Sequence, residues 1–130
     1  MTNFYHFTST VHLPVILEAG LLKLTESNVD ALIPHAGPDV VWLLDVPQID
    51  HHHGLEGSAV DKTEVMFTVD VPAINWLDWT WGASMDPRDR SRFIEVAGGM
   101  EAAEHWYVWP APIPRRRWLS VTSAGKKVEL

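Results

Sequence analysis

The chain has 130 residues, of which 46% are hydrophobic and 21% charged, so global disorder is excluded and one compact domain over residues 1–130 is expected. It contains no cysteine, which excludes disulfides, thiolate metal sites and a cysteine nucleophile. The net charge of −7 opposes non-specific binding to nucleic acid, and no apolar run is long enough to cross a bilayer, so we expect a soluble, cytoplasmic protein without membrane contact.

A short strand is predicted at the amino terminus. Residues 3–8 are dominated by strand-forming Tyr, Phe and Thr. Because successive side chains of a strand point to opposite faces, His6 and Thr8 share one face. An imidazole and a hydroxyl are unusual neighbours in a core strand. The pair either hydrogen-bonds to the backbone, which is the commoner case for a lone histidine, or grips a hydroxyl or phosphate of a ligand.

A helix is predicted to follow this strand directly. Apolar residues recur at helical spacing over residues 11–22. Either Ser9 or Thr10 is suited to cap the start of the helix. Pro14 fits only in the first turn, and Gly20 marks the end.

The rest of the chain is predicted to be mostly strands. Residues 23–39 are expected to form a connection, and the Trp-rich residues 74–82 could form a short helix. A strand, a helical region and then a series of strands is the order of an α+β domain, not of alternating βαβ units. The runs that favour strands are residues 40–44, 64–71, 92–96, 104–109 and 118–121.

Acidic and histidine side chains supply two further candidate sites. In an extended loop, His51 and His53 would face one way and could bind zinc in a small metal-dependent hydrolase. No HExxH motif accompanies them, so a polar loop is the commoner interpretation. Glu104 opens a hydrophobic strand, where a carboxylate is either a solvated strand end or a base in an aromatic cleft. Glu95 and Glu101 compete with it for that role.

Basic residues form two groups. Arg88, Arg90 and Arg92 would share one face of an extended segment, where they would either aid solubility or contact a diphosphate or a nucleic acid. For the run at residues 115–117, solubility is the preferred interpretation. Neither a GxGxxG motif nor a P-loop is present, so any nucleotide must bind in another way.

The stretch YHFTSTVHLPVILEAGLL (residues 5–22) resembles the opening of ADP-ribosyltransferase-fold proteins, most closely the DarT-type nucleic-acid-modifying toxins. In that family an aromatic-His-x-Thr strand runs into a helix of the form NLPxILxxGLL, and His12 stands here where Asn is frequent. VWLLD (41–45) resembles the family's second strand, and AEHWYVWPAPIPRRRWLSV (103–121) resembles its late catalytic element. The resemblance implies an ADP-ribosyltransferase-like α+β fold, with two small, mostly antiparallel sheets that form a cleft and one or two N-terminal helices.

The resemblance also implies a toxin-like, NAD-dependent mono-ADP-ribosyltransferase, a glycosyltransferase that uses NAD as co-substrate and releases nicotinamide. Glu104 would be the catalytic residue and would hold the nicotinamide ribose. His6, Phe7, Thr8 and Trp42 would bind NAD, with His6 on the adenosine-side ribose and Trp42 on the nicotinamide side.

The partners that the resemblance implies, besides NAD, are an acceptor and a regulator or target. The acceptor would be a nucleic acid, a protein or a small molecule, and a toxin would also have an antitoxin or a host target. The basic residue that DarT-type enzymes use would be Arg88, Arg90 or Arg92. No resident metal is implied. The alternative is a catalytically inactive domain of this fold that binds a nucleotide or a partner protein.

Overall fold

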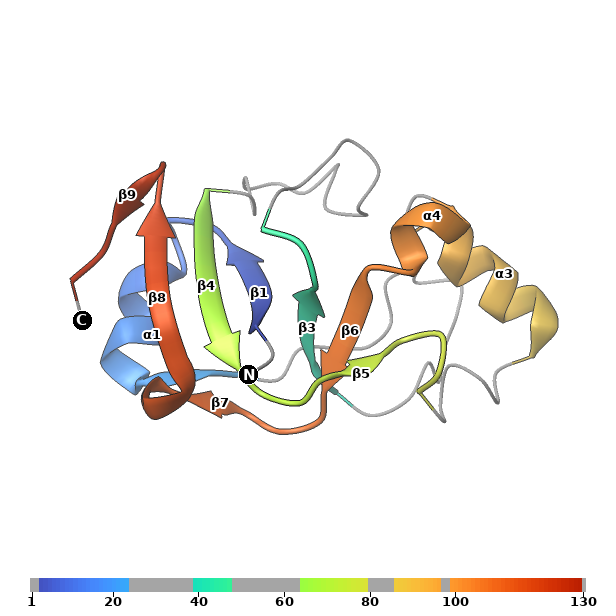
Figure 1. Cartoon of the computed structure of the whole chain (residues 1–130), viewed down its shortest axis with the longest axis horizontal. Helices are drawn as coiled ribbons and strands as arrows, with labels where there is room; N and C mark the ends of the chain where they lie inside the picture. Colours follow the sequence, from blue (N-terminus) through green and yellow to red (C-terminus); the bar gives the residue numbers. More distant parts are fainter. Residues whose placement is uncertain (1–2, 24–38, 48–63, 80–85, 97–98, 130) are drawn as a thin grey trace.

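The computed structural model describes residues 3–23, 39–47, 64–79, 86–96 and 99–129, and these ranges form an α+β fold (Figure 1). The expected α+β class is therefore confirmed. The described helices are α1 (Leu13–Ala19), α3 (Pro87–Val96) and α4 (Met100–Ala103), with a 3₁₀ turn at Arg115–Arg117. The described strands are β1 (Asn3–Thr8), β2 (Leu21–Leu22), β3 (Val41–Leu44), β4 (Val65–Asp70), β5 (Ile74–Asn75), β6 (Trp106–Trp109), β7 (Ile113–Pro114), β8 (Trp118–Ser123) and β9 (Lys126–Lys127).

Most strands join one large sheet instead of two small ones. The seven-stranded sheet has the order β5-β6-β3-β1-β4-β8-β9, and every neighbouring pair in it is antiparallel. Strands β2 and β7 form a separate antiparallel pair. Figure 1 shows α1 at the β8 end of the large sheet and α3 with α4 beyond β6 at the opposite end. None of the described helices is long and apolar enough to span a membrane.

Among the described residues, the buried apolar side chains form two clusters. The first is centred on β4 and includes the fully buried Phe67, with apolar residues of α1 packed against it. The second joins β3 and β6 to α3 through Val40, Val108 and Phe93. Because side chains alternate along a strand, Val41 of β3 enters the first cluster, whereas Val40 on the other face enters the second. Strand β3 therefore connects the two cores.

The predicted amino-terminal strand and helix are both present, although the helix is shorter than expected. Gly20 adopts a left-handed conformation (φ 67°) and ends α1, so the two leucines that follow leave the helix and form β2. Pro14 lies in the first turn, as predicted. The capping prediction is wrong, because the N-cap is His12 and no side chain caps the helix.

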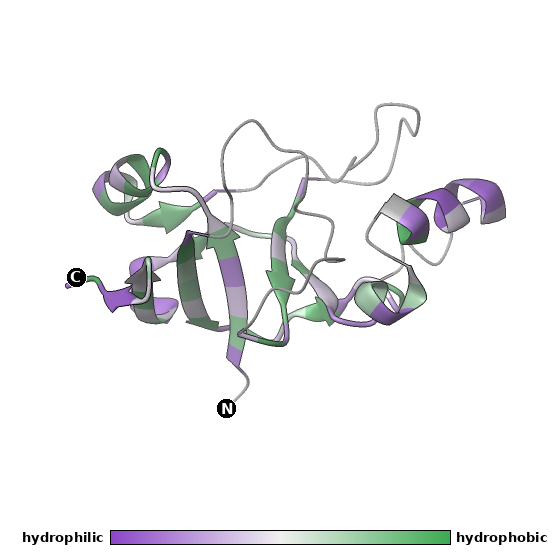
Figure 2. Ribbon diagram, turned by 90° about the horizontal axis from the view of Figure 1, so that it is seen from above, coloured by the Kyte–Doolittle hydropathy of each residue, from purple (hydrophilic) through white to green (hydrophobic). Residues whose placement is uncertain are grey.

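The strand predicted at residues 92–96 is wrong, because this segment belongs to α3. The carboxylate of Asp86 accepts a hydrogen bond from the N–H of Arg88 (2.9 Å), and Pro87 is the first helical residue, which together favour a helix start. Phe93 and Ile94 of this helix pack in the second cluster, and Figure 2 colours most of the helix ribbon as hydrophilic. So few apolar residues leave no helical periodicity to recognise in the sequence.

The Trp-rich segment also differs from its prediction. Ile74 and Asn75 form the short strand β5, and the chain then makes a turn through Trp79. The side-chain oxygen of Asn75 accepts a hydrogen bond of 3.0 Å from the N–H of Leu77. This local bond favours a turn over a continuing helix. Residues 80–82 of this segment, most of the expected connection at residues 23–39, and both His51 and His53 lie outside the described residues.

Candidate functional site

Each of the three segments that carry the family resemblance includes one of three adjacent strands, β1, β3 and β6. Strand β3 pairs with β1 on one side and with β6 on the other, although about 35 and 60 residues separate the three segments along the chain. The pairs Tyr5–Leu44 and Leu44–Trp106 place these three residues in one row across the sheet. Glu104 lies two residues before Trp106, at the amino-terminal end of β6.

The junction between β1 and β3 is short. Among the described residues the two strands share the single register pair Tyr5–Leu44, whereas β1 and β4 share six pairs. Immediately beyond the shared pair, the Nδ1 atom of His6 forms a hydrogen bond of 2.8 Å with the carbonyl oxygen of Trp42. The His6 side chain therefore joins β1 to β3 where the backbone ladder between them ends.

The hydrogen bond to Trp42 shows which ring nitrogen of His6 carries a hydrogen. A carbonyl oxygen only accepts, so Nδ1 must carry the hydrogen. Burial lowers the pKa of His6 below its usual value of 6.5, and the bond to the Trp42 carbonyl offsets only part of that effect. At neutral pH the ring is therefore neutral, and Nε2 is an acceptor for a donor such as a ribose hydroxyl.

The structure divides the four predicted NAD-binding residues between two faces of the sheet. His6 and Thr8 pair with Phe67 and Val65, which belong to the first cluster, so these two side chains share a face as the alternation predicted. Phe7 and Trp42 lie on the opposite face by the same alternation. The indole of Trp42 packs edge-on against Trp106 at 5.7 Å between ring centroids. His6 thus meets the backbone of Trp42 and not its ring.

Glu104 lies in a helical turn and does not open the strand. Its backbone (φ −62°, ψ −22°) caps the carboxyl end of α4, and its N–H bonds to the carbonyl of Met100, so β6 begins two residues later. The carbonyl of Glu104 accepts a hydrogen bond of 2.8 Å from the side-chain amide of Asn75. This bond holds the backbone of Glu104 against β5, while its side chain stays exposed to solvent.

The two competing carboxylates lie on helices. Glu101 is exposed in the first turn of α4, and Glu95 is exposed on α3. Neither has a described hydrogen bond to a strand, whereas the backbone of Glu104 has one to Asn75. Of the three candidates, Glu104 is the residue next to the β1–β3–β6 strands.

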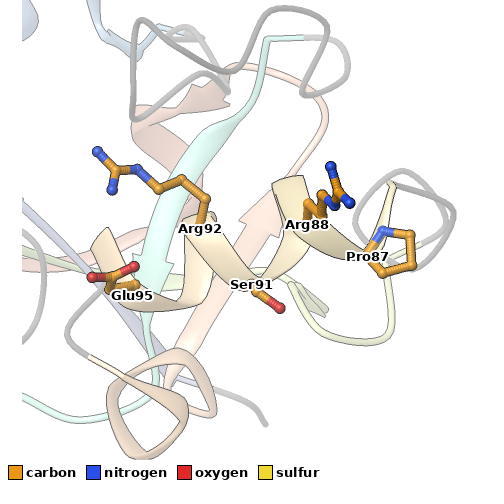
Figure 3. A pocket seen from close by; sticks show the side chains of 5 residues that line it. All are labelled: Pro87, Arg88, Ser91, Arg92 and Glu95. Atoms are coloured by element: carbon orange, nitrogen blue, oxygen red, sulfur yellow. The ribbon is translucent and has the colours of Figure 1, made fainter.

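The three arginines of residues 88–92 do not share a face, because the segment is helical. Arg90 points inward: it donates to the carbonyl of Leu77 (3.3 Å), and its guanidinium lies 5.9 Å from the ring centroid of Trp76. Arg88 and Arg92 are one helical turn apart and line a shallow pocket on the exposed side of α3 (Figure 3). The remaining lining residues are Pro87, Ser91 and Glu95.

In the basic run at residues 115–117, Arg115 makes structural contacts. The Arg115 guanidinium donates to the carbonyl of Leu17 and lies 5.6 Å from the ring centroid of Trp118. The N–H of Arg115 also bonds to the carbonyl of Gly20 (3.0 Å). A cation at the carboxyl end of α1 is favourable for the helix dipole, so Arg115 anchors this helix.

An aspartate–histidine pair next to Glu104 was missed in the sequence. Asp45 directly follows β3, and His105 directly precedes β6. Their side chains meet at 2.7 Å, and the N–H of Asp45 bonds to the carbonyl of His105 (3.3 Å). The available signal was the position of each residue at the end of a hydrophobic run, but only the antiparallel pairing of those runs brings the two ends together.

Among the residues that the structure describes, no group of three or more His, Asp or Glu side chains could hold a metal ion. No protein-family model, curated protein or solved structure matches the chain. The case for a function therefore rests on the motifs and on the geometry described above.

Proposed function

We propose that the protein is an NAD-dependent mono-ADP-ribosyltransferase with the ADP-ribosyltransferase-like fold, and that its active site spans β1, β3 and β6. The observation that carries the proposal is the adjacency of the three motif segments, which are distant in the chain but neighbours in the sheet. Chance similarity in three separate segments gives no reason for them to meet at one place.

The spacing of His6 and Glu104 suits a dinucleotide. The two residues are two strands apart across the sheet and about three residues apart along it. With strands about 4.8 Å apart and a rise of about 3.4 Å per residue, their Cα atoms are on the order of 10–15 Å apart. NAD has two riboses joined by a diphosphate, so one ribose can reach each residue. Nε2 of His6 accepts a hydroxyl of the adenosine ribose, and Glu104 faces the nicotinamide ribose.

Glu104 has two roles in the proposed reaction. Its carboxylate accepts a hydrogen bond from a hydroxyl of the nicotinamide ribose, which fixes the sugar for reaction. It also stabilises the positive charge that develops at C1′ as the bond to nicotinamide breaks. The bond between Asn75 and the Glu104 carbonyl supports this role, because it limits movement of the residue.

The exposed side of α3 is our proposed contact for the acceptor. Arg88 and Arg92 supply two cationic side chains one turn apart, which suits phosphate groups of a nucleic acid. Arg90 points away from this side of the helix, towards Leu77 and Trp76. Because the whole chain carries a net charge of −7, attraction of a nucleic acid depends on such a local patch. A protein or small-molecule acceptor, and a toxin role with an antitoxin, belong to the same proposal.

The decisive experiment compares Glu104→Gln with Glu101→Gln. Nicotinamide release from NAD is followed by chromatography, with single-stranded DNA, RNA and a cell extract as acceptors. Glu104→Gln keeps the size of the side chain but removes its charge, so we expect the rate to fall about 100-fold or more. The exposed Glu101 of α4 is the matched control, and its variant should retain the wild-type rate.

Two outcomes would contradict the proposal. Undiminished release by Glu104→Gln would remove this residue from the mechanism. Stabilisation of the wild-type protein by NAD without any release would favour the inactive binding domain. In that case saturation with NAD at 100 times its Kd raises the free energy of unfolding by about 2.7 kcal/mol.

A further inference from the structure

The Asp45–His105 pair is an oriented imidazole at the edge of the proposed active site. A carboxylate only accepts hydrogen bonds, so Nδ1 of His105 carries the hydrogen that it shares with Oδ1 of Asp45 at 2.7 Å. Nε2 is then the ring nitrogen that can accept a proton from a substrate. The carboxylate thus selects one tautomer and one ring orientation, as the third member of a catalytic triad does.

The pair is held in place yet open to solvent. Asp45 and His105 are also joined through their backbones by the bond from the Asp45 N–H to the His105 carbonyl. The side chain of His105 is 41% exposed and that of Asp45 33%, so the imidazole is accessible to a substrate. Such access is what proton transfer to or from a substrate requires.

The Asp45–His105 pair lies next to Glu104, the proposed catalytic residue. Glu104 and His105 are consecutive residues, and Asn75 holds the backbone of Glu104 from β5. Three strand ends therefore converge on this point: the end of β3, the end of β5 and the start of β6. A carboxylate for the ribose and a base for the second reactant are presented from one turn of the chain.

We propose that His105 is the general base that activates the acceptor, and that Asp45 is its positioning residue; this inference rests on the proposed transferase function. Nε2 of His105 removes the proton from an O–H or N–H group of the acceptor. The oxygen or nitrogen then forms a bond to C1′ of the nicotinamide ribose. The bond from C1′ to the ring nitrogen breaks, its electron pair neutralises the pyridinium, and nicotinamide leaves. His105 finally releases the proton to solvent.

A general base at His105 limits the class of acceptor. A group that is already deprotonated and nucleophilic at neutral pH gains nothing from a general base. A hydroxyl group, a water molecule or the amide N–H of a nucleobase does gain from one. The acceptor site therefore takes substrates whose reacting atom carries a proton.

The test uses substitutions that separate chemistry from structure. In His105→Asn the amide nitrogen occupies roughly the place of Nδ1, so it preserves the bond to Asp45 but removes the base. Asp45→Asn removes the charge that orients the ring. The control is His12→Asn, at an exposed helix start on a different element.

The measurement is kcat and KM for nicotinamide release from NAD, with water alone and with single-stranded DNA or RNA oligonucleotides. We expect His105→Asn to lower kcat about 100-fold or more with little change in the KM for NAD and an unchanged melting temperature. Asp45→Asn should lower kcat less, and His12→Asn should leave both constants unchanged.

The outcomes distinguish this inference from the function on which it rests. Wild-type kcat in His105→Asn, in a protein whose Glu104→Gln variant is inactive, overturns the base and leaves the transferase intact. A fall in kcat that is matched by a fall in melting temperature also overturns it, because the pair would then be structural. Absence of nicotinamide release by the wild-type protein overturns both proposals.

Discussion

His6 combines a structural and a proposed binding role in one imidazole. Nδ1 donates to the Trp42 carbonyl and links β1 to β3, and the ring edge faces Phe67 at 6.3 Å between centroids. This burial is what lowers the pKa of His6, because a charged ring would lose its hydration. The neutral ring has an acceptor atom left for a ligand, which is the property that the proposed ribose contact requires.

The lowered pKa of His6 predicts how stability depends on pH. The unfolded chain binds a proton at His6 near its usual pKa of 6.5, whereas the folded chain does so only at lower pH. The contribution of neutral His6 to the free energy of unfolding is therefore fully present above pH 6.5. It is lost as the pH falls from 6.5 towards the pKa of His6 in the folded protein. We expect urea unfolding between pH 5 and pH 8 to show this loss, and His6→Asn, which keeps a donor near Nδ1, to show less of it. Equal pH dependence in both proteins would contradict the prediction.

The β8–β9 hairpin is an element whose turn residue is strained. Ser123 and Lys126 pair directly, so the loop has two residues, and both have positive φ: 51° for Ala124 and 79° for Gly125. This is the geometry of a type I′ turn, which matches the twist of the flanking strands. Glycine adopts such a conformation freely, but alanine does so at a cost because its Cβ crowds the backbone.

Replacing the strained alanine should stabilise the protein. Asn is favoured at the first position of a type I′ turn, so Ala124→Asn is expected to raise the free energy of unfolding by about 0.5–1 kcal/mol. The reverse control is Gly125→Ala, which places a Cβ at positive φ and should lower it by about 1 kcal/mol. Both are measured by urea denaturation. A neutral or destabilising Ala124→Asn would show that the turn carries no strain.

At the scale of the whole molecule, two hydrophobic clusters flank a narrow junction. The first cluster surrounds β4, the second lies between β6 and α3, and the single register pair of β1 with β3 connects the strands between them. The proposed NAD site crosses this junction. Strand β3 contributes side chains to both clusters, but the two sets of buried residues are distinct, so each core can open to some extent independently of the other.

Independent opening can be detected with a variant of the second cluster. Phe93 stacks on Trp76 at 5.4 Å between centroids, so Phe93→Leu should lower the free energy of unfolding by about 1 kcal/mol. Hydrogen exchange should then accelerate in α3 and β6 more than in β4. Val121→Ala, in the first cluster, should accelerate hydrogen exchange in β4 more than in α3 and β6. Uniform acceleration in both variants would mean that the molecule opens as one unit.

Local chemistry explains which elements were predictable. The strand formers at residues 3–8, the apolar periodicity before Gly20 and the alternation at residues 64–71 each act over a few residues, and β1, α1 and β4 appear where they were expected. Helix α3 was missed because its apolar residues show no helical periodicity in the sequence; Phe93 and Ile94, which pack in the second cluster, are adjacent in the chain. The two-residue strand β2 was missed because β7, its partner, comes about 90 residues later.

Local sequence patterns are enough to predict the α+β class, the main strands and the residues that carry the motifs, because these depend on neighbours within one turn or one strand. Which of those residues contact one another depends on the tertiary structure. The register of β3 against β1 and β6 places His6 at the Trp42 carbonyl and Asp45 at His105. Strand register depends on the packing of whole faces across the sheet, and no short stretch of sequence contains that information.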